Sequence, residues 1–158
     1  MSNPARPLRL HRRALPALTV VAMLASGSAW AVDYKSVGND PAILYDAPTL
    51  RGNRIAIAPR GMPVEIVFAQ NDWIKVRDSF GALSWIEKKA LVDRRTVVAT
   101  DPVPLDVHAS ADGNAPVVFR VQPGVWMELA VPPASGWVGV RHRDGQSGFV
   151  RVGSVWGE

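Results

Sequence analysis

The chain contains two halves that repeat the same order of apolar runs and turn residues. Gly61 of the first half recurs as Gly124, and Trp73 recurs as Trp137. The distance along the chain from Trp73 to Trp137 exceeds the distance from Gly61 to Gly124 by one position, which one inserted loop residue explains. Because a long sequence period marks a repeated structural unit, the fold must hold two similar units in succession.

Each half is divided by Gly, Pro, Asn and Asp clusters into apolar runs that are each about five residues long. In the first half Val64, Ile66 and Phe68 alternate with other residues, which predicts that they share the buried face of a strand. No segment after residue 31 keeps an apolar 3.6-residue period, so almost no helix is expected. Parallel strands need long crossover connections, and the short segments between the apolar runs have no room for them. We therefore predict two small all-β barrels of short antiparallel strands.

The segment 1–31 has the three-part pattern of a secretory signal peptide. Four arginines and no acidic residue precede an apolar stretch, and small residues end the segment. Ala29 and Ala31 supply the A-x-A ending, which predicts cleavage after Ala31. The alternative is a retained membrane anchor, although a span needs roughly 20 apolar residues and this run is shorter.

The excess positive charge of the chain belongs to this first segment. The 158 residues carry 18 Lys and Arg against 14 Asp and Glu, and the segment holds four of the arginines. The part that would remain after cleavage, 32–158, is therefore formally neutral. A neutral domain lacks the positive field that attracts nucleic acid, so nucleic acid is not an expected partner.

Short aromatic motifs in the two halves resemble the bacterial SH3-like (SH3b) domain family. The segments that carry the resemblance are 71–76 and 84–86 in the first half and 136–140 and 148–150 in the second. Ser84 stands where the family usually has glycine, and Phe149 where it usually has tryptophan. The expected organisation is a signal peptide at 1–31, a first SH3-like barrel at 32–95 and a second at 96–158.

Few residues suit catalysis or metal binding. The chain has no cysteine, which excludes a thiolate nucleophile and disulfide bonds. After residue 31 the only histidines are His108 and His142, which are too few for a convincing zinc site or Ser-His-Asp arrangement. We expect no enzyme, no metal site and no cofactor; an envelope hydrolase with two cleft carboxylates is a remote alternative.

Aromatic side chains are the candidate binding groups. Trp73 and Trp137 begin strands whose following residues point inward, which places both indoles on the opposite face. A half-exposed indole is suited to contact a sugar face or an extended peptide. The candidate ligand-binding residues are Tyr45, Trp73, Trp85, His108, Trp137 and Phe149. Covering the barrel ends and joining the two modules are the competing uses of these rings.

The sequence therefore predicts an exported, non-catalytic binding protein, periplasmic or secreted, without a membrane span once the signal is cleaved. The family resemblance implies a cell-wall (peptidoglycan) peptide or glycan, or an envelope protein, as the partner. The alternative function is a scaffold or assembly protein whose aromatic rings are buried in a partner or dimer interface. The oligomeric state and the ability of both modules to bind are left open by the sequence.

Overall fold

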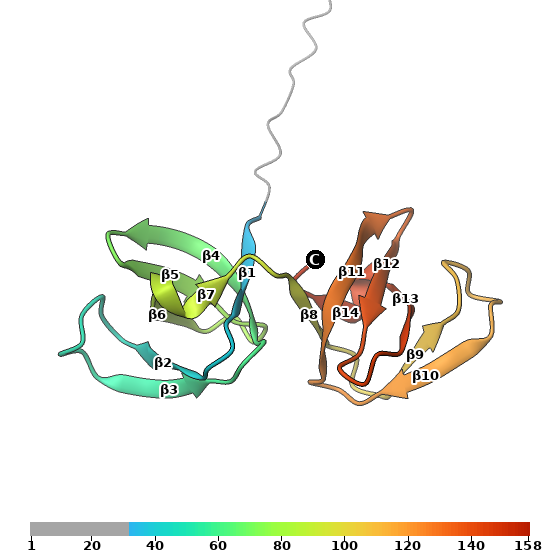
Figure 1. Ribbon diagram of the computed structural model, residues 1–158, viewed down its shortest axis with the longest axis horizontal. Helices are drawn as coiled ribbons and strands as arrows, with labels where there is room; N and C mark the ends of the chain where they lie inside the picture. Colours follow the sequence, from blue (N-terminus) through green and yellow to red (C-terminus); the bar gives the residue numbers. More distant parts are fainter. Residues whose placement is uncertain (1–31) are drawn as a thin grey trace, which may run out of the picture. The chain divides into compact units, whose positions relative to one another are not determined.

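The structure is a computed structural model that describes residues 32–158, which fall in one compact unit. The predicted signal peptide and its cleavage at Ala31 lie outside the described residues. Strands dominate the described part, which holds two short 3-10 turns and no α-helix (Figure 1). The prediction of an all-β protein with two tandem small antiparallel barrels is confirmed. No helix within residues 32–158 has the length and apolar character to cross a membrane.

The first repeat is a seven-stranded antiparallel sheet. Its elements are β1 (Tyr34–Val37), β2 (Ala42–Tyr45), β3 (Arg54–Ala58), β4 (Pro63–Gln70), β5 (Trp73–Arg77), β6 (Leu83–Glu87), η1 (Lys88–Ala90) and β7 (Leu91–Val92). The strand order is β3-β2-β6-β5-β4-β1-β7, so β3 and β7 are the edges.

The second repeat has the same elements in the same order. They are β8 (Thr96–Ala99), β9 (Leu105–His108), β10 (Val117–Val121), β11 (Trp126–Ala134), β12 (Trp137–Arg141), β13 (Ser147–Arg151), η2 (Val152–Ser154) and β14 (Val155–Trp156). The sheet order β10-β9-β13-β12-β11-β8-β14 matches the first repeat strand for strand. The repeat in the sequence is therefore a repeat in topology.

Each repeat has its own apolar core, built from alternate residues of its strands. The first core consists of Val37, Ala42, Leu44, Ala58, Val64, Ile74, Val76 and Ile86. The second consists of Val97, Ala99, Leu105, Val107, Val121, Met127, Val138, Val140, Val150 and Val155. Alternation within β5 places Ile74 and Val76 in the core, as the sequence predicts, and leaves the neighbouring residues on the outer face.

A bulge in β4 corrects the prediction for Phe68. Ile66 is paired with Val76, but Phe68 is paired with the next residue along, Lys75, so Val67 is an extra residue in the strand. The bulge moves Phe68 to the outer face, where it is 55% exposed instead of sharing the buried face with Ile66.

The same bulge recurs in β11 and explains a glycine. Leu129 is paired with Val140, and Val131 with Gly139. The second repeat therefore has its bulge at the position that corresponds to the bulge of the first repeat. A Cβ atom on Gly139 would lie 2.5 Å from the Cβ atom of Val131, a distance that such atoms do not adopt. Glycine at position 139 therefore allows β11 and β12 to approach closely around the bulge.

Side chains of the two repeats contact each other within this unit. The rings of Tyr34 and Trp156 meet edge to face with centroids 5.1 Å apart. The Arg95 guanidinium lies 5.2 Å from the centre of the Tyr34 ring and donates a 2.8 Å hydrogen bond to the carbonyl oxygen of Gly157. These contacts join the beginning of the first sheet to the end of the second.

Candidate functional site

Three of the predicted binding residues lie together on the outer face of the first sheet. Tyr45 in β2 and Lys75 in β5 are both cross-strand partners of Trp85 in β6, and directly paired residues share a face. Trp73 lies two residues before Lys75 in β5 and therefore on the same face. With Phe68 from the bulged strand, these residues form what we name the first aromatic face.

The rings of the first aromatic face contact one another edge to face. The centroids of Tyr45 and Trp73 are 5.3 Å apart at an interplanar angle of 89°. Those of Phe68 and Trp85 are 6.3 Å apart at 83°. The Lys75 Nζ atom lies 5.9 Å from the centre of the Trp85 ring, within the range of a cation–π contact. Such contacts hold the rings in defined orientations while leaving part of their surface open.

Exposure differs across the first aromatic face. Tyr45 is 4% exposed and is covered by its neighbours, whereas Trp73 and Trp85 are half-buried and Phe68 is exposed. The open part of the surface is therefore formed by two indoles and a phenyl ring beside a lysine. This combination offers flat apolar surface, indole N–H groups and one positive charge to a ligand.

The other three predicted residues form the equivalent cluster on the second sheet, the second aromatic face. His108 in β9 is paired with Phe149 in β13, and the His108 and Trp137 rings lie 5.6 Å apart at 84°. The Nδ1 atom of His108 lies 2.9 Å from the carbonyl oxygen of Ala115. Since a carbonyl oxygen only accepts hydrogen bonds, Nδ1 carries a hydrogen and donates it to Ala115.

The second aromatic face has no open indole, unlike the first, although His108 and Phe149 are half-buried. Trp137 is 6% exposed, and the Arg151 guanidinium lies 4.1 Å from its ring centre. The expectation of a half-exposed indole is therefore wrong for Trp137, although its ring does lie outside the core. The bulge partners Phe68 and Lys75 of the first face correspond to Val131 and Gly139 here, so these two positions of the second face carry neither a ring nor a cation.

The structure thus gathers the six predicted residues into two clusters of three, one on each sheet. Sequence reasoning did not find Phe68, Lys75 or Arg151. A simple alternation places Phe68 in the core, and only the bulge reverses this. Arg151 follows Phe149 by two residues, a spacing that puts both on one face of a strand and that would have identified it.

Asp144 and His142 form the polar contact with the clearest effect on ionisation. The backbone N–H of Gln146 donates to the Asp144 carboxylate at 3.0 Å, and the Nδ1 atom of His142 lies 3.0 Å from the same carboxylate. These hydrogen bonds, the backbone one first, lower the pKa of Asp144 to about 2. The pair lies in the turn between β12 and β13. Among residues 32–158, no group of three or more His, Asp or Glu residues is arranged to hold a metal ion.

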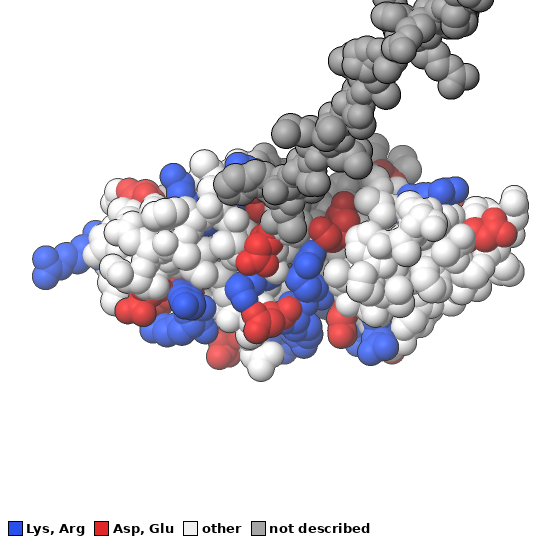
Figure 2. Space-filling view, turned by 90° about the horizontal axis from the view of Figure 1, so that it is seen from above, with Lys and Arg blue, Asp and Glu red and all other residues white. Residues whose placement is uncertain are grey.

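Basic and acidic side chains are mixed on the surface that Figure 2 shows. Lys and Arg side chains lie among Asp and Glu side chains near the middle of the view, with wide uncharged areas on either side.

Comparison with known families gives one match that covers both repeats. The family described as bacterial SH3 domain matches residues 38–93 and again residues 102–157. The two matched segments correspond to the two sheets. A search of curated proteins found no match.

Several solved structures match this chain at low identity and with TM-scores below 0.5. They include NlpC2 of Trichomonas vaginalis, with 12% identity over 80% of this chain and 48% of that one and a TM-score of 0.37. NlpC1 of the same organism has 14% identity over 90% and 52%, and a TM-score of 0.37. An NlpC/P60 family protein of Bacillus cereus has 16% identity over 78% and 55%, and a TM-score of 0.34. The present chain spans about half the length of each.

Proposed function

Because this chain belongs to the bacterial SH3 domain family, we propose that it is an exported, non-catalytic binding protein of the bacterial envelope. Its ligand in this proposal is a peptidoglycan peptide or glycan. Residues 1–31 would direct export and be removed after Ala31, which leaves the two repeats at 32–95 and 96–158 as the working protein.

The open first aromatic face is the observation that supports a binding role. Trp73 and Trp85 are half-buried, and Phe68 is 55% exposed on the same face. Exposed aromatic rings held by edge-to-face contacts lose little conformational freedom when they bind, which favours affinity. Lys75 adds a charge that suits the carboxylate of a wall peptide.

The two repeats have different roles in this proposal. The first repeat binds the ligand through its open face, with Tyr45 as a buried support for Trp73. In the second repeat Arg151 covers the Trp137 ring, so this indole contacts a ligand only if the guanidinium moves away. The proposal therefore assigns the larger share of affinity to the first repeat.

A sedimentation assay with purified cell-wall sacculi tests the binding role. The wild-type protein is expected to sediment with the sacculi, and Phe68→Ala and Trp85→Ala are each expected to weaken binding by about tenfold. Phe80→Ala is the matched control, because Phe80 is 94% exposed and lies in the β5–β6 turn, outside the first aromatic face. Equal sedimentation of the wild type with and without sacculi, or of all four proteins, would contradict the proposal.

A scaffold or assembly role is the second candidate, and the edge strand β3 favours it. Ile55 and Ile57 on this strand are 53% and 72% exposed, although β3 is an edge of the sheet. At the position that corresponds to Ile57, the second repeat has Arg120, which forms an ion pair with Asp106. Exposed apolar residues on an unpaired edge strand promote association with another strand.

The scaffold role is tested by the mass of the protein in solution. If β3 joins two copies, sedimentation velocity should show a concentration-dependent dimer that Ile57→Lys abolishes. Ile55→Thr and Ile57→Lys should then leave the sacculus binding of the first aromatic face unchanged. A monomer at all concentrations, with no envelope protein lost on Ile57→Lys in crosslinked cells, would remove this candidate.

A further inference from the structure

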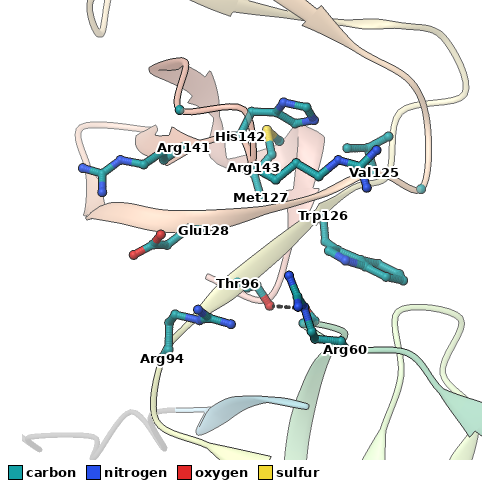
Figure 3. Close-up of a pocket in the computed structure, with 13 residues that line it drawn as sticks. Arg60, Arg94, Thr96, Val125, Trp126, Met127, Glu128, Arg141, His142 and Arg143 are labelled. Carbon is teal, nitrogen blue, oxygen red and sulfur yellow. Dashed lines mark hydrogen bonds between the residues drawn. The ribbon is translucent and has the colours of Figure 1, made fainter. Parts of the chain in front are cut away.

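A pocket of about 540 Å³ lies where the two repeats meet, away from both aromatic faces. Residues of the β3–β4 turn, of the segment between the repeats, and of the β11 and β12–β13 regions line it. Thr96 fixes one wall, since its Oγ1 atom donates a 2.8 Å hydrogen bond to the carbonyl oxygen of Gly61 (Figure 3). Neither repeat alone contains this pocket.

Four arginines line the pocket: Arg60, Arg94, Arg141 and Arg143. Glu128 is the only carboxylate among the lining residues. Within residues 32–158, no lining arginine forms an ion pair with a carboxylate. A formally neutral pair of repeats thus concentrates uncompensated positive charge in one hollow.

The concentration of positive charge in the pocket is clear from the second repeat, because this repeat contains only four arginines. Arg120 forms an ion pair with Asp106, and Arg151 covers the ring of Trp137. The other two, Arg141 and Arg143, both line the pocket. Like charges repel one another when they are brought close, so an anion in the pocket would be stabilised by all of them.

The directions of the side chains separate the arginines into two groups. In Figure 3 Arg60 and Arg94 are directed into the pocket, and Arg143 extends toward the Trp126 side. Arg141, the cross-strand partner of Glu128, extends to the left of this view, away from Arg60. Arg60, Arg94 and Arg143 are therefore the groups available to an incoming anion.

Trp126 supplies a flat wall beside these charges. Its Nε1 atom lies 3.5 Å from the position that a Cβ atom on Gly61 would occupy, so the indole packs against the turn that carries Arg60. Guanidinium groups are planar donors that fit the two oxygens of a carboxylate or phosphate. Three of them around a pocket of this size suit a ligand with more than one such group.

We propose that the pocket at the junction of the two repeats binds a ligand with at least two phosphate or carboxylate groups, held by Arg60, Arg94 and Arg143. This site is separate from the first aromatic face and does not depend on the envelope ligand proposed for that face. Because both repeats contribute arginines, binding there would also hold the two repeats together.

Titration of the full chain with two chemically defined anions tests the site. Tripolyphosphate and tricarballylate are the probes, and calorimetry at low salt measures affinity, while NMR follows the indole N–H signals of Trp126 and Trp85. Saturable binding of either probe is expected, with a shift of the Trp126 signal and none of the Trp85 signal. Tighter binding of tripolyphosphate identifies phosphate as the preferred group, and tighter binding of tricarballylate identifies carboxylate.

Arginine variants distinguish specific binding in the pocket from non-specific electrostatic attraction. Arg60→Ala and Arg94→Ala are each expected to lower affinity by about tenfold, and Arg51→Ala, an exposed arginine outside the pocket, to leave it unchanged. Circular dichroism and thermal unfolding confirm that each variant is folded. An equal loss for Arg51→Ala and Arg60→Ala, or no saturable binding of either probe, would overturn the proposal, whatever the outcome of the sacculus assay.

Discussion

The hydroxyl oxygen of Thr96 lies 2.7 Å from that of Ser36, 60 residues earlier in the chain, and both residues are buried. Thr96 also donates its hydrogen to the carbonyl oxygen of Gly61, so Ser36 is the donor in the first bond. The resulting chain of hydrogen bonds runs from Ser36 through Thr96 to Gly61. It ties the first strand of the second repeat to two segments of the first repeat.

Thr96→Val is expected to destabilise the whole protein. The substitution keeps the shape of the side chain but leaves the buried Ser36 hydroxyl and the Gly61 carbonyl without their partner, which costs about 1–3 kcal/mol. Urea unfolding monitored by circular dichroism measures the loss. Thr100→Val is the control, since Thr100 is exposed and should change the free energy of unfolding very little; equal effects of the two would contradict the role of the hydroxyl chain.

The ring contact between Tyr34 and Trp156 should couple the two repeats energetically. A double-mutant cycle with Tyr34→Ala and Trp156→Ala is expected to give a coupling energy of about 0.5–1.5 kcal/mol, the range for edge-to-face pairs. A second cycle with Tyr34→Ala and Trp85→Ala serves as the reference, because the structure records no ring contact for that pair. Additive effects of the two substitutions in the first cycle would show that the ring contact does not couple the two repeats energetically.

Gly148→Ala is expected to disturb the second sheet. A Cβ atom at this position would lie 2.6 Å from the carbonyl oxygen of His108 and 2.7 Å from Val107 Cγ1, so the strands β9 and β13 must move apart. Overpacking of this kind costs roughly 1–3 kcal/mol. Gly153→Ala has open space around the new Cβ atom and should be close to neutral in the same unfolding measurement. A neutral Gly148→Ala would mean that β13 adjusts freely.

Removal of Arg151 should expose the Trp137 indole. Arg151→Ala takes away the guanidinium that lies 4.1 Å from the Trp137 ring centre, which exposes the indole and costs about 0.5–1 kcal/mol. Acrylamide quenching of tryptophan fluorescence is expected to increase, and the Trp137 indole signal to shift. Arg51→Ala should change neither quantity. If quenching stays constant on Arg151→Ala, another side chain covers Trp137.

Asp144 should titrate well below an ordinary aspartate. Its pKa in the folded protein is about 2, below the ordinary 3.8, so its hydrogen bonds stabilise the folded state above about pH 4 and this contribution is lost as the pH falls toward 2. NMR titration of the Asp144 carboxyl carbon measures the midpoint. His142→Ala should raise the midpoint but leave it below 3.8, because the larger cause is the Gln146 amide; an ordinary midpoint in the wild type would refute this assignment.

Much of the fold was predictable because its signals are local. Alternation in β5 identified Ile74 and Val76 as core residues and Trp73 as an outer one, and the recurrence of the tryptophan at 137 identified the second repeat. Turn residues such as Gly61 and Gly124, which both adopt a φ of +80°, separate the strands at corresponding positions. The sequence also named Tyr45, Trp73 and Trp85 as candidates, and strand pairing in the structure places them on one face.

The sequence by itself determined the two repeats, their antiparallel strands and the aromatic candidates, because periodicity and turn chemistry are properties of neighbouring residues. The tertiary structure alone decided that a bulge turns Phe68 outward, that Arg151 covers the Trp137 ring, and that Arg60 and Arg94 share one pocket with Arg143. These features depend on strand register and on contacts between distant segments, which no local pattern encodes. Two repeats with one topology thereby present two aromatic faces, of which only the first has partly exposed indoles.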